Sequence, residues 1–335
     1  NLILTNKSSF HRIQKHRYSK NINIFNTFDD YKKIFKTKVD YTMSSITGIQ
    51  GLKPTIDIIK YSKKIAIANK EAIICGWHLI EKNLKKYKTN FIPVDSEHFS
   101  IWYALRDIDK NLIDKIYITA SGGPFLNTPL NKLKNVNIKQ ATNHPNWKMG
   151  KKISVDSATM MNKVFEIIEA KKIFNISYKK ISILVHSKSY VHAIIKFKNG
   201  LTKLVVHDTN MKIPIFNSLY SSSKFINSKN LDFRILNNLD FKPIDYKRFP
   251  VTKILNILPD ESSLFENILV YSNDRLVKLF LNKKIKFTDI QKILFKVINY
   301  IEFKKLKSKK PKNIKEINNL NKIVNSKINK IVYKL

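Results

Sequence analysis

The sequence is poor in glycine, in cysteine and in long apolar runs. It has 7 glycines in 335 residues, and its single cysteine, Cys75, excludes an intramolecular disulfide. A composition with one cysteine also favours a reducing compartment. No apolar run is long enough to span a bilayer, so we expect a soluble protein without a membrane partner.

Acidic residues are also scarce, because 25 Asp and Glu stand against 62 Lys and Arg and give a formal net charge of +37. Such a charge is typical of nucleic-acid-binding proteins. The lysines, however, are spread along the whole chain, with no Arg-rich arm and no concentrated basic block. A general preference for Lys, Asn and Ile explains this pattern better. We therefore expect no nucleic-acid partner, although an anionic substrate would benefit from the positive field.

The sequence has neither a G-x-G-x-x-G motif nor a Walker-type loop, and it begins at Asn1, which indicates a processed chain or a fragment. Glycine is needed where the backbone approaches a ligand or adopts a positive φ, so the placement of the few glycines is informative. Five of them lie in motif-like places: Gly48, Gly51, Gly122, Gly123 and Gly150.

Short apolar runs alternate with helical patterns in the first part of the chain, as in the buried run at 65–68. This βαβ alternation predicts an α/β fold with a parallel sheet and with ligands at the carboxyl ends of its strands. Asn199-Gly200 between two apolar runs predicts a hairpin. The Ser- and Asn-rich stretch 221–246 is expected to be a linker. From about residue 250 the pattern is helical, ending in one apolar stripe of Ile317, Leu320, Val324, Ile328 and Ile331.

The stretch 143–166 is too polar for a core-building segment, because each buried polar group would need a partner. Its second half is predicted to be a helix entered from Asp156-Ser157, with Asn162 and Glu166 four apart on one face. Ser157 at the helix start, with Asn162 and an exposed Lys163, would form a phosphate cradle. The alternative is an ordinary amphipathic helix with a solvated polar face.

Asp95 and Glu97 follow the strand-like run 91–94 and lie two apart in a segment expected to be extended. Their side chains should therefore point the same way. Two carboxylates, with Glu166 as a possible third, suit Mg²⁺ or Mn²⁺ and leave positions for substrate oxygens. The alternative for such a short motif is surface charge.

Two further patterns indicate ligand contact. Ser121-Gly122-Gly123 after a strand-like run offers a hydroxyl and bare N–H groups, either as an anion nest or as a simple tight turn. His144 and Trp147 lie in a loop bounded by Pro145 and Gly150. We expect this loop to be a mobile lid that covers a ligand and excludes water.

Together these patterns resemble the 1-deoxy-D-xylulose 5-phosphate reductoisomerase family. The resemblance covers nearly the whole chain and is strongest from about 65 to 215. Its most specific part is the long central motif. The motifs that carry it are NKE at 69–71, PVDSEH at 93–98, TASGGPF at 119–125, NHPNWKMGKKISVDSATMMNK at 143–163, Glu166, NMKIPI at 210–215 and LDF…LDFKPIDYKRFP at 231–250.

The resemblance implies an NADPH-dependent conversion of 1-deoxy-D-xylulose 5-phosphate to 2-C-methyl-D-erythritol 4-phosphate, a sugar phosphate substrate, and Mg²⁺ or Mn²⁺ held by Asp95, Glu97 and Glu166. NADPH would contact Asn69, Glu71 and Gly150, with Trp147 on the flap. The implied catalytic residues are Lys70, Glu97, His144 and Glu166. The implied substrate contacts are Lys70, Ser96, Glu97, Ser121, His144, Ser157, Asn162, Lys163 and Glu166.

The resemblance also implies a domain order. We expect the remainder of a Rossmann-like NADPH-binding domain at 1–90, a central α+β catalytic domain at 91–220, the linker at 221–246 and a C-terminal helical domain at 247–335. Members of the family are usually homodimers. The compartment would be the bacterial cytoplasm or, as an alternative, a plastid-like organelle.

The chain departs from the family pattern in several places. The usual N-terminal strand and GSTGSIG-type loop, which hold the dinucleotide pyrophosphate, do not occur in these residues. We therefore expect this chain to bind NADPH poorly, and a non-catalytic remnant that binds metal and sugar phosphate is the alternative function. Val164-Phe165 also replaces a usual Gly-Leu pair, Ser187-Lys188 a usual Pro-Gln, and Ser272-Asn273-Asp274 a usual Ala-Asn-Glu.

Overall fold

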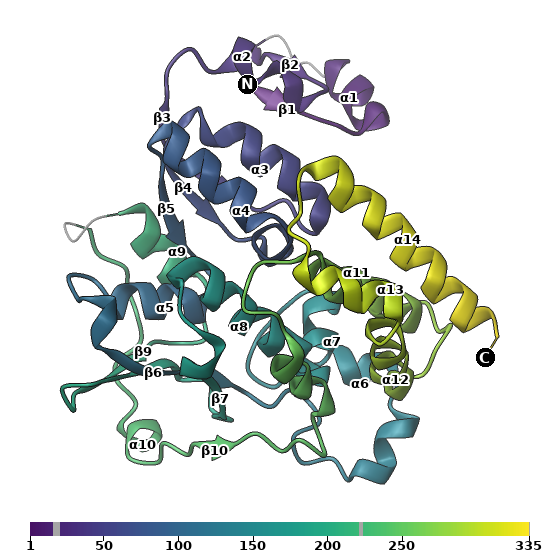
Figure 1. The fold of residues 1–335 in the computed structure, drawn as a ribbon. Helices are drawn as coiled ribbons and strands as arrows, with labels where there is room; N and C mark the ends of the chain where they lie inside the picture. The colour runs from purple at the N-terminus through teal and green to yellow at the C-terminus, as the bar shows by residue number, and fades with distance from the viewer. Residues whose placement is uncertain (16–20, 221–223, 335) are drawn as a thin grey trace.

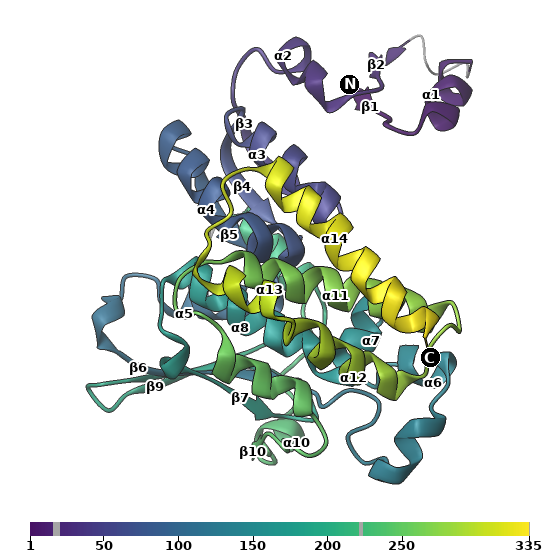
Figure 2. The same ribbon diagram turned by 45° about the vertical axis from the view of Figure 1, so that its right-hand side comes forward.

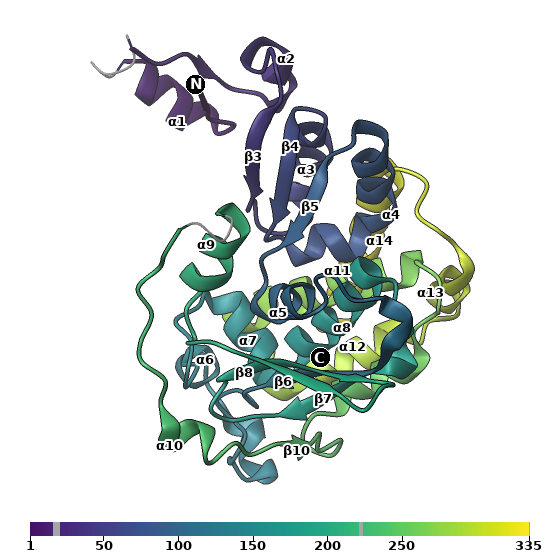
Figure 3. The ribbon, with the colours of Figure 1, turned by 90° about the vertical axis from the view of Figure 1, so that its left-hand side faces the viewer.

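The computed structural model describes residues 1–15, 21–220 and 224–334, so the first three positions of the predicted linker lie outside the described residues. Figures 1, 2 and 3 show a small N-terminal unit at the top, a sheet with its helices below it, and a larger lower part. The lower part contains a second sheet and the C-terminal helices. The site described below lies between the two sheets.

The N-terminal unit consists of β1 (Leu2–Ile3), α1 (Lys7–Gln14), β2 (Ile24–Phe25), a 3-10 turn η2 (Phe28–Asp30) and α2 (Tyr31–Ile34). Its two short strands pair in parallel. The Asn6 side chain begins α1 by accepting a hydrogen bond from the Ser9 N–H. Figure 1 shows that the connection leading into β3 joins this unit to the rest of the chain.

The first large sheet has the order β3 (Val39–Ser44), β4 (Ser62–Ile67), β5 (Asn90–Pro93), and all its strands are parallel. The connections contain η3 (Ile49–Gly51), α3 (Leu52–Ile59) and α4 (Lys70–Tyr87). This confirms the parallel sheet predicted from the βαβ alternation. The carboxyl ends of β4 and β5 lead into α4 and α5 (Ser96–Ala104), so the starts of both helices meet at one edge of the sheet.

The second sheet has the order β10 (Lys242–Pro243), β7 (Ile181–Val185), β6 (Ile113–Ala120), β8 (Val191–Phe197), β9 (Thr202–Val206). Only β6 and β7 pair in parallel. The predicted hairpin joins β8 to β9, and Gly200 has the positive φ of +88° that its turn requires. The predicted linker is not wholly a linker, because β10 adds a strand to this sheet.

The central helix differs from the prediction. It does not begin at Asp156-Ser157 but consists of α7 (Lys151–Thr159) and α8 (Met161–Phe174), separated by Met160 in the left-handed region with φ of +67°. Ser157 therefore lies in the last turn of α7, whereas Asn162 and Lys163 lie in the first turn of α8. The buried helix α8 packs against α4, α5, α7 and β7.

The remaining elements include the smaller helices of the central part and the C-terminal helices. Among the described helices, none is long and apolar enough to cross a membrane. The helices not yet given are η4 (Lys110–Leu112), η5 (Leu130–Asn135), α6 (Ile138–Thr142), η6 (Tyr178–Lys180), α9 (Lys212–Leu219), α10 (Phe233–Leu236), η7 (Pro250–Ile257), α11 (Leu264–Leu281), α12 (Phe287–Ile298), α13 (Ile301–Lys304), η8 (Lys305–Ser308) and α14 (Ile314–Tyr333).

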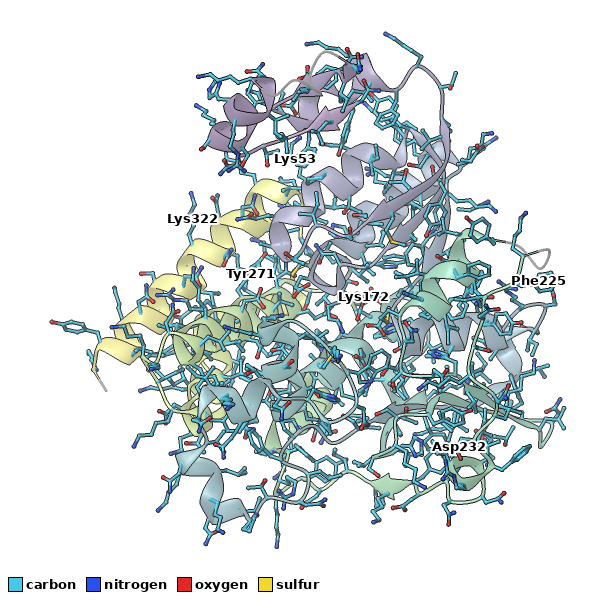
Figure 4. All side chains as sticks on the ribbon, turned by 180° about the vertical axis from the view of Figure 1, so that it is seen from behind. Lys53, Lys172, Phe225, Asp232, Tyr271 and Lys322 are labelled. Carbon is cyan, nitrogen blue, oxygen red and sulfur yellow. The ribbon has the colours of Figure 1, made fainter. Side chains whose placement is uncertain are left out.

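Helix α11 is the centre of the C-terminal part, because it packs against α4, α7, α12 and α14. The five residues of the predicted apolar stripe are the buried residues of α14. Tyr271 of α11, labelled in Figure 4, donates a hydrogen bond to the Ile317 carbonyl of α14 at 3.0 Å. The helical C-terminal part is therefore joined to both the first sheet and the central helices.

Candidate active site

The carboxylates of Asp95 and Glu97 lie at the start of α5, which corrects the expectation of an extended segment. Asp95 caps the helix and accepts a hydrogen bond from the Glu97 N–H at 3.3 Å. Both side chains nevertheless face the same region, because one precedes the helix and the other lies in its first turn. Glu166 reaches this region from α8, and carboxylate oxygens of Asp95, Glu97 and Glu166 all lie within 4.8 Å of one another.

Two lysines neutralise these carboxylates. Lys70 Nζ lies 3.3 Å from Asp95 Oδ2 and 3.3 Å from Glu166 Oε1, and it donates a hydrogen bond to Asn162 Oδ1 at 2.7 Å. The Asn162 amide in turn donates to Glu166 Oε1. The predicted common face of Asn162 and Glu166 is therefore confirmed, and this face points toward Lys70.

Lys163 is the second lysine, and the prediction that it is exposed was wrong. Lys163 is only 5% exposed. Its Nζ lies 2.6 Å from Glu97 Oε1 and forms a further ion pair with Glu166. The break at Met160 separates α8 from α7, and Lys163 is buried together with most of α8.

The crowding of these groups shifts their ionisation. Burial and the neighbouring Glu166 raise the pKa of Glu97 to about 7, although Lys163 acts in the opposite direction. Burial opposes the charge of Lys163, but Glu166 and Glu97 outweigh it and raise the pKa of the lysine. Because the buried carboxylates of this cluster depend on neighbouring cations to stay charged, the cluster is suited to a further cation.

A second group, Asp95, His98 and Glu169, shares one carboxylate with the first and also has ligand atoms within 4.8 Å. Burial lowers the pKa of His98, but Glu169 and Asp95 outweigh it and raise this pKa to about 9. His98 and Glu169 do not line the adjoining cavity, whereas Asp95, Glu97 and Glu166 do. The first group is therefore the one that could hold a metal together with a ligand.

His144 has a defined tautomer. Its Nδ1 accepts hydrogen bonds from the N–H groups of Asn146 at 3.2 Å and Trp147 at 3.0 Å. Burial and the nearby charge of Lys163 lower the pKa of His144 to about 4, so the ring is neutral at neutral pH. The proton is therefore on Nε2, which donates to Ser121 Oγ at 2.9 Å.

Ser121 lies at the end of β6 and also accepts a hydrogen bond from the Gly123 N–H at 3.1 Å. Gly123 has a φ of +66°, and a Cβ there would lie 2.8 Å from the Ser157 carbonyl oxygen. The turn after β6 can thus pack directly on the end of α7 only because it has no side chain at this position. This close contact brings Ser121 and Ser157 to the same cavity.

A cavity of about 240 Å³ unites the predicted substrate residues. Ser157 reaches it from α7, Asn162 and Lys163 from α8, and Trp147 from the predicted lid. Trp147 packs edge-on to His192, with the ring centroids 6.1 Å apart. All nine residues predicted to contact the substrate line the cavity: Lys70, Ser96, Glu97, Ser121, His144, Ser157, Asn162, Lys163 and Glu166.

A second cavity, of about 1040 Å³, adjoins the first and shares Ala68, Lys70 and Ile153 with it. The predicted cofactor residues Asn69, Glu71 and Gly150 all line this second cavity. Asn69 is itself only 3% exposed. It caps α4 and donates to the Ile46 and Gly48 carbonyls, so it also fixes the loop that forms one wall.

Several residues that line the two cavities were missed from the sequence. Ser189, His192 and Met211 line the first cavity, and Lys152 and Asp274 line the second. The only signal for His192 was a histidine between Val191 and Ala193 in a mainly apolar strand. Burial is the main reason that its pKa is lowered to about 3, so the ring is neutral.

Three protein-family models match the sequence of the chain. The model described as 1-deoxy-D-xylulose 5-phosphate reductoisomerase matches residues 1–76, and its C-terminal domain model matches residues 91–174. A further DXP reductoisomerase C-terminal domain model matches residues 207–327. The matched residues therefore extend over most of the chain.

Named relatives agree with these models. The chain is 62% identical over 331 residues to the 1-deoxy-D-xylulose 5-phosphate reductoisomerase of Pelagibacter ubique strain HTCC1062, which covers 98% of this chain and 85% of the relative. It is 38% identical to the enzyme of the same name from Sulfurihydrogenibium sp. strain YO3AOP1, over 84% of this chain and 74% of the relative.

Solved structures show the same fold. The reductoisomerase of Zymomonas mobilis in complex with NADPH superposes with a TM-score of 0.86 at 29% identity, covering 99% of this chain and 86% of that chain. A DOX-P reductoisomerase in complex with NADPH, fosmidomycin and magnesium gives a TM-score of 0.86 at 27% identity with the same coverage. The chain belongs to the 1-deoxy-D-xylulose 5-phosphate reductoisomerase family.

Proposed function

We propose that the chain converts 1-deoxy-D-xylulose 5-phosphate to 2-C-methyl-D-erythritol 4-phosphate with NADPH and a divalent cation, in non-mevalonate isoprenoid biosynthesis. The observation that carries this proposal is the convergence of Asp95, Glu97 and Glu166 on a cavity that adjoins a second, larger one. The first cavity would take the sugar phosphate and the second the cofactor. The comparisons offer no support for a non-catalytic remnant.

Asp95, Glu97 and Glu166 would hold Mg²⁺ or Mn²⁺. They offer carboxylate oxygens only, which these hard cations prefer. Burial and, after it, the charge of Glu166 raise the pKa of Glu97, and a bound cation would favour its charged form. When bound, the ion would chelate adjacent substrate oxygens and polarise the carbonyl. Lys70 and Lys163 already neutralise part of this charge, so they would orient the carboxylates and contact substrate oxygens.

The phosphate would also bind in the first cavity. Ser121, Ser157, Asn162 and Lys163 supply two hydroxyls, an amide and a cation. Ser121 follows β6, Ser157 belongs to α7, and the other two belong to α8, which meets α7 at Met160. His144 would donate from Nε2 and stay neutral, so it adds a directed hydrogen bond without a second charge. Ser96, on α5, would contact the sugar beside Glu97.

The cofactor would place its nicotinamide end where the two cavities meet, between Lys70 and Ile153. Asn69 and Glu71 would line one side and Gly150 the other. The family's reaction rearranges the carbon skeleton and then transfers a hydride from NADPH to the resulting aldehyde. The substrate carbonyl must therefore be held near the cofactor, and Trp147 on the lid would exclude water from both.

The test is substrate-dependent oxidation of NADPH by the chain in the presence of Mg²⁺, with the product identified by mass spectrometry and NMR. We expect 2-C-methyl-D-erythritol 4-phosphate and one NADP⁺ for each substrate consumed. Chelation of the metal should abolish both. Binding of substrate and Mg²⁺ without NADPH oxidation at millimolar cofactor would contradict the proposal and favour the non-catalytic alternative.

We also propose that the chain forms a homodimer. Several of the described large apolar side chains between 219 and 246 are exposed, among them Phe225 at 92% and Phe233 at 65%. Figure 4 labels Phe225 and Asp232 along the same side of the molecule. Light scattering at micromolar concentration should give a dimer, and the Phe225→Ser/Phe233→Ser double variant should shift it toward monomer. A monomeric parent chain would contradict this proposal.

A further inference from the structure

Lys152 lies among carboxylates from three different elements. Its Nζ is 2.7 Å from Glu71 Oε1 on α4, 2.9 Å from Asp156 Oδ2 on α7 and 2.9 Å from Asp274 Oδ1 on α11. The ring of Phe165 lies 5.5 Å from the same nitrogen. One side chain near the start of α7 therefore contacts the first sheet's helix, its own helix and the C-terminal helices.

The arrangement is reinforced around Asp156, which is only 1% exposed. Asn273, the neighbour of Asp274 on α11, donates a hydrogen bond from its amide to Asp156 Oδ1 at 2.7 Å. Two consecutive residues of α11 thus contact α7, Asp274 at Lys152 and Asn273 at Asp156. The position of α7 relative to α11 is set at two points.

These contacts are close to the residues that would bind the cofactor. Lys152 follows Gly150 by two positions, and Glu71 is one of its three partners. Glu71, Gly150, Lys152, Asp156 and Asp274 all line the second cavity. Moving Lys152 would consequently change the distance between the two sides of that cavity.

Stability alone is a poor explanation for this cluster. Three carboxylates around one ammonium leave excess negative charge in a partly buried place, and buried ion pairs are weak evidence for stability because desolvation offsets their attraction. What the cluster does provide is geometry, because each partner comes from a separate element. A charged residue held from three sides has little freedom to move.

We propose that Lys152 and Asp274 are positioning residues for NADPH, through which α11 holds Glu71 and Gly150 at the spacing that the nicotinamide end requires. This inference rests on the proposed function. Neither residue contacts the metal-binding carboxylates or lines the first cavity. The C-terminal helices would thereby act on cofactor binding without contacting the sugar phosphate.

The proposal predicts a selective loss of cofactor affinity. Without the Asp274 charge, Lys152 is held by two carboxylates instead of three and can shift toward α4, which displaces Gly150. We expect Asp274→Asn and Lys152→Met each to weaken NADPH binding about tenfold, the lower end of what loss of an outer partner costs at metal sites. The affinities for Mg²⁺ and fosmidomycin should stay at the parent values.

The experiment measures all three affinities on the full chain, NADPH by its fluorescence and the other two ligands by calorimetry. Thermal unfolding of each variant is recorded as well. Asp274→Glu keeps the charge but enlarges the side chain, and it should recover most of the NADPH affinity. No such recovery would be expected if Asp274 acted only by filling space. Lys152→Met has a side chain of similar length that can pack on Phe165, so it serves if Asp274→Asn does not fold.

The matched control is the ion pair between Lys172 and Glu266, which also joins a helix of the central part to α11. Lys172 Nζ lies 2.7 Å from Glu266 Oε2, and Figure 4 labels this lysine. Both residues are buried, and neither lines either cavity. Glu266→Gln should lower the melting temperature at least as much as Asp274→Asn while leaving the NADPH affinity unchanged.

A double variant completes the test. If Lys152 and Asp274 act through one another, Lys152→Met/Asp274→Asn should bind NADPH about as tightly as either single variant. The inference would be overturned if folded Asp274→Asn and Lys152→Met bound NADPH like the parent, or if Glu266→Gln lost the same affinity. Absence of NADPH binding by the unchanged chain at millimolar cofactor would instead contradict the proposed function.

Discussion

Lys163 and Glu97 are 66 positions apart in the sequence, yet Lys163 Nζ lies 2.6 Å from Glu97 Oε1 and both side chains are largely buried. The pair joins the first turn of α8 to the first turn of α5. It therefore connects the phosphate side of the cavity to the carboxylates that would hold the metal. Binding of a ligand at one of these places should therefore change the affinity at the other.

Lys163→Ala should reduce both ligand binding and stability. Removal of the lysine takes the ion-pair partner from Glu97 and leaves Glu166 with Lys70 alone. Breaking a buried ion pair in this way costs about 3–5 kcal/mol. Calorimetry should show weaker binding of fosmidomycin, and chemical denaturation should show a lower free energy of unfolding that Mg²⁺ partly restores. Lys171→Ala, on the same helix, is the control. Parent-like affinity of Lys163→Ala would show that the phosphate-site assignment is wrong.

Glu166→Gln and Glu169→Gln should differ although the residues are one turn apart on α8. Glu166 faces the cavity, whereas Glu169 belongs to the group with His98, which does not line it. We expect Glu169→Gln to lower Mn²⁺ affinity by about 10- to 100-fold as an outer partner, and Glu166→Gln to lower it further. Electron paramagnetic resonance titration with Mn²⁺ measures this. A larger loss for Glu169→Gln would place the metal in the second group.

His144 should remain neutral across the physiological pH range, because its pKa is lowered to about 4. Since the folded state then binds fewer protons than the unfolded state between about pH 4 and pH 6.5, stability should fall as the pH is lowered through this window. Replacement by Asn should remove this part of the pH dependence. NMR titration of the imidazole gives the pKa directly, and a midpoint near 6.5 would contradict the lowered pKa.

Lys88 ends α4 in the left-handed region with a φ of +51°, and it is exposed. Lys88→Gly should therefore stabilise the protein by about 1 kcal/mol, because glycine adopts this conformation without the steric cost of a Cβ. Lys86→Gly, two residues earlier inside the helix, should destabilise by about the same amount. Urea denaturation compares them, and effects of equal sign would contradict this C-terminal geometry.

The sequence predicted the parallel sheet, the β8–β9 hairpin and the buried face of α14 because each depends on local periodicity or on one turn. It also predicted part of the lining of the two cavities, some residues from local patterns and the others from the resemblance, but it missed Ser189, His192, Met211, Lys152 and Asp274. Asp95 and Glu97 were expected in an extended segment, whereas Asp95 caps a helix. The prediction that the two carboxylates converge was correct, but the reason is their place at the start of α5 and not an extended segment.

Two features could not be predicted from local patterns. The helix break at Met160 has no glycine or proline to mark it. Lys163 is buried because α8 packs among α4, α5, α7 and β7, which no local pattern in the sequence indicates. The contact of Asp274 with Lys152 joins positions 122 apart, and neither residue lies in a pattern that indicates a partner. Such contacts depend on how α7 and α11 pack, which only the three-dimensional structure provides.

The most direct test of the metal site is the position of Mn²⁺ in a crystal of the protein, located by anomalous scattering. The site should show one strong peak, about 2.0–2.6 Å from oxygens of Asp95, Glu97 and Glu166. With fosmidomycin added, the ligand should contact the same ion from the first cavity. A peak between His98 and Glu169, or none near Glu166, would contradict the proposed site and the chemistry assigned to it.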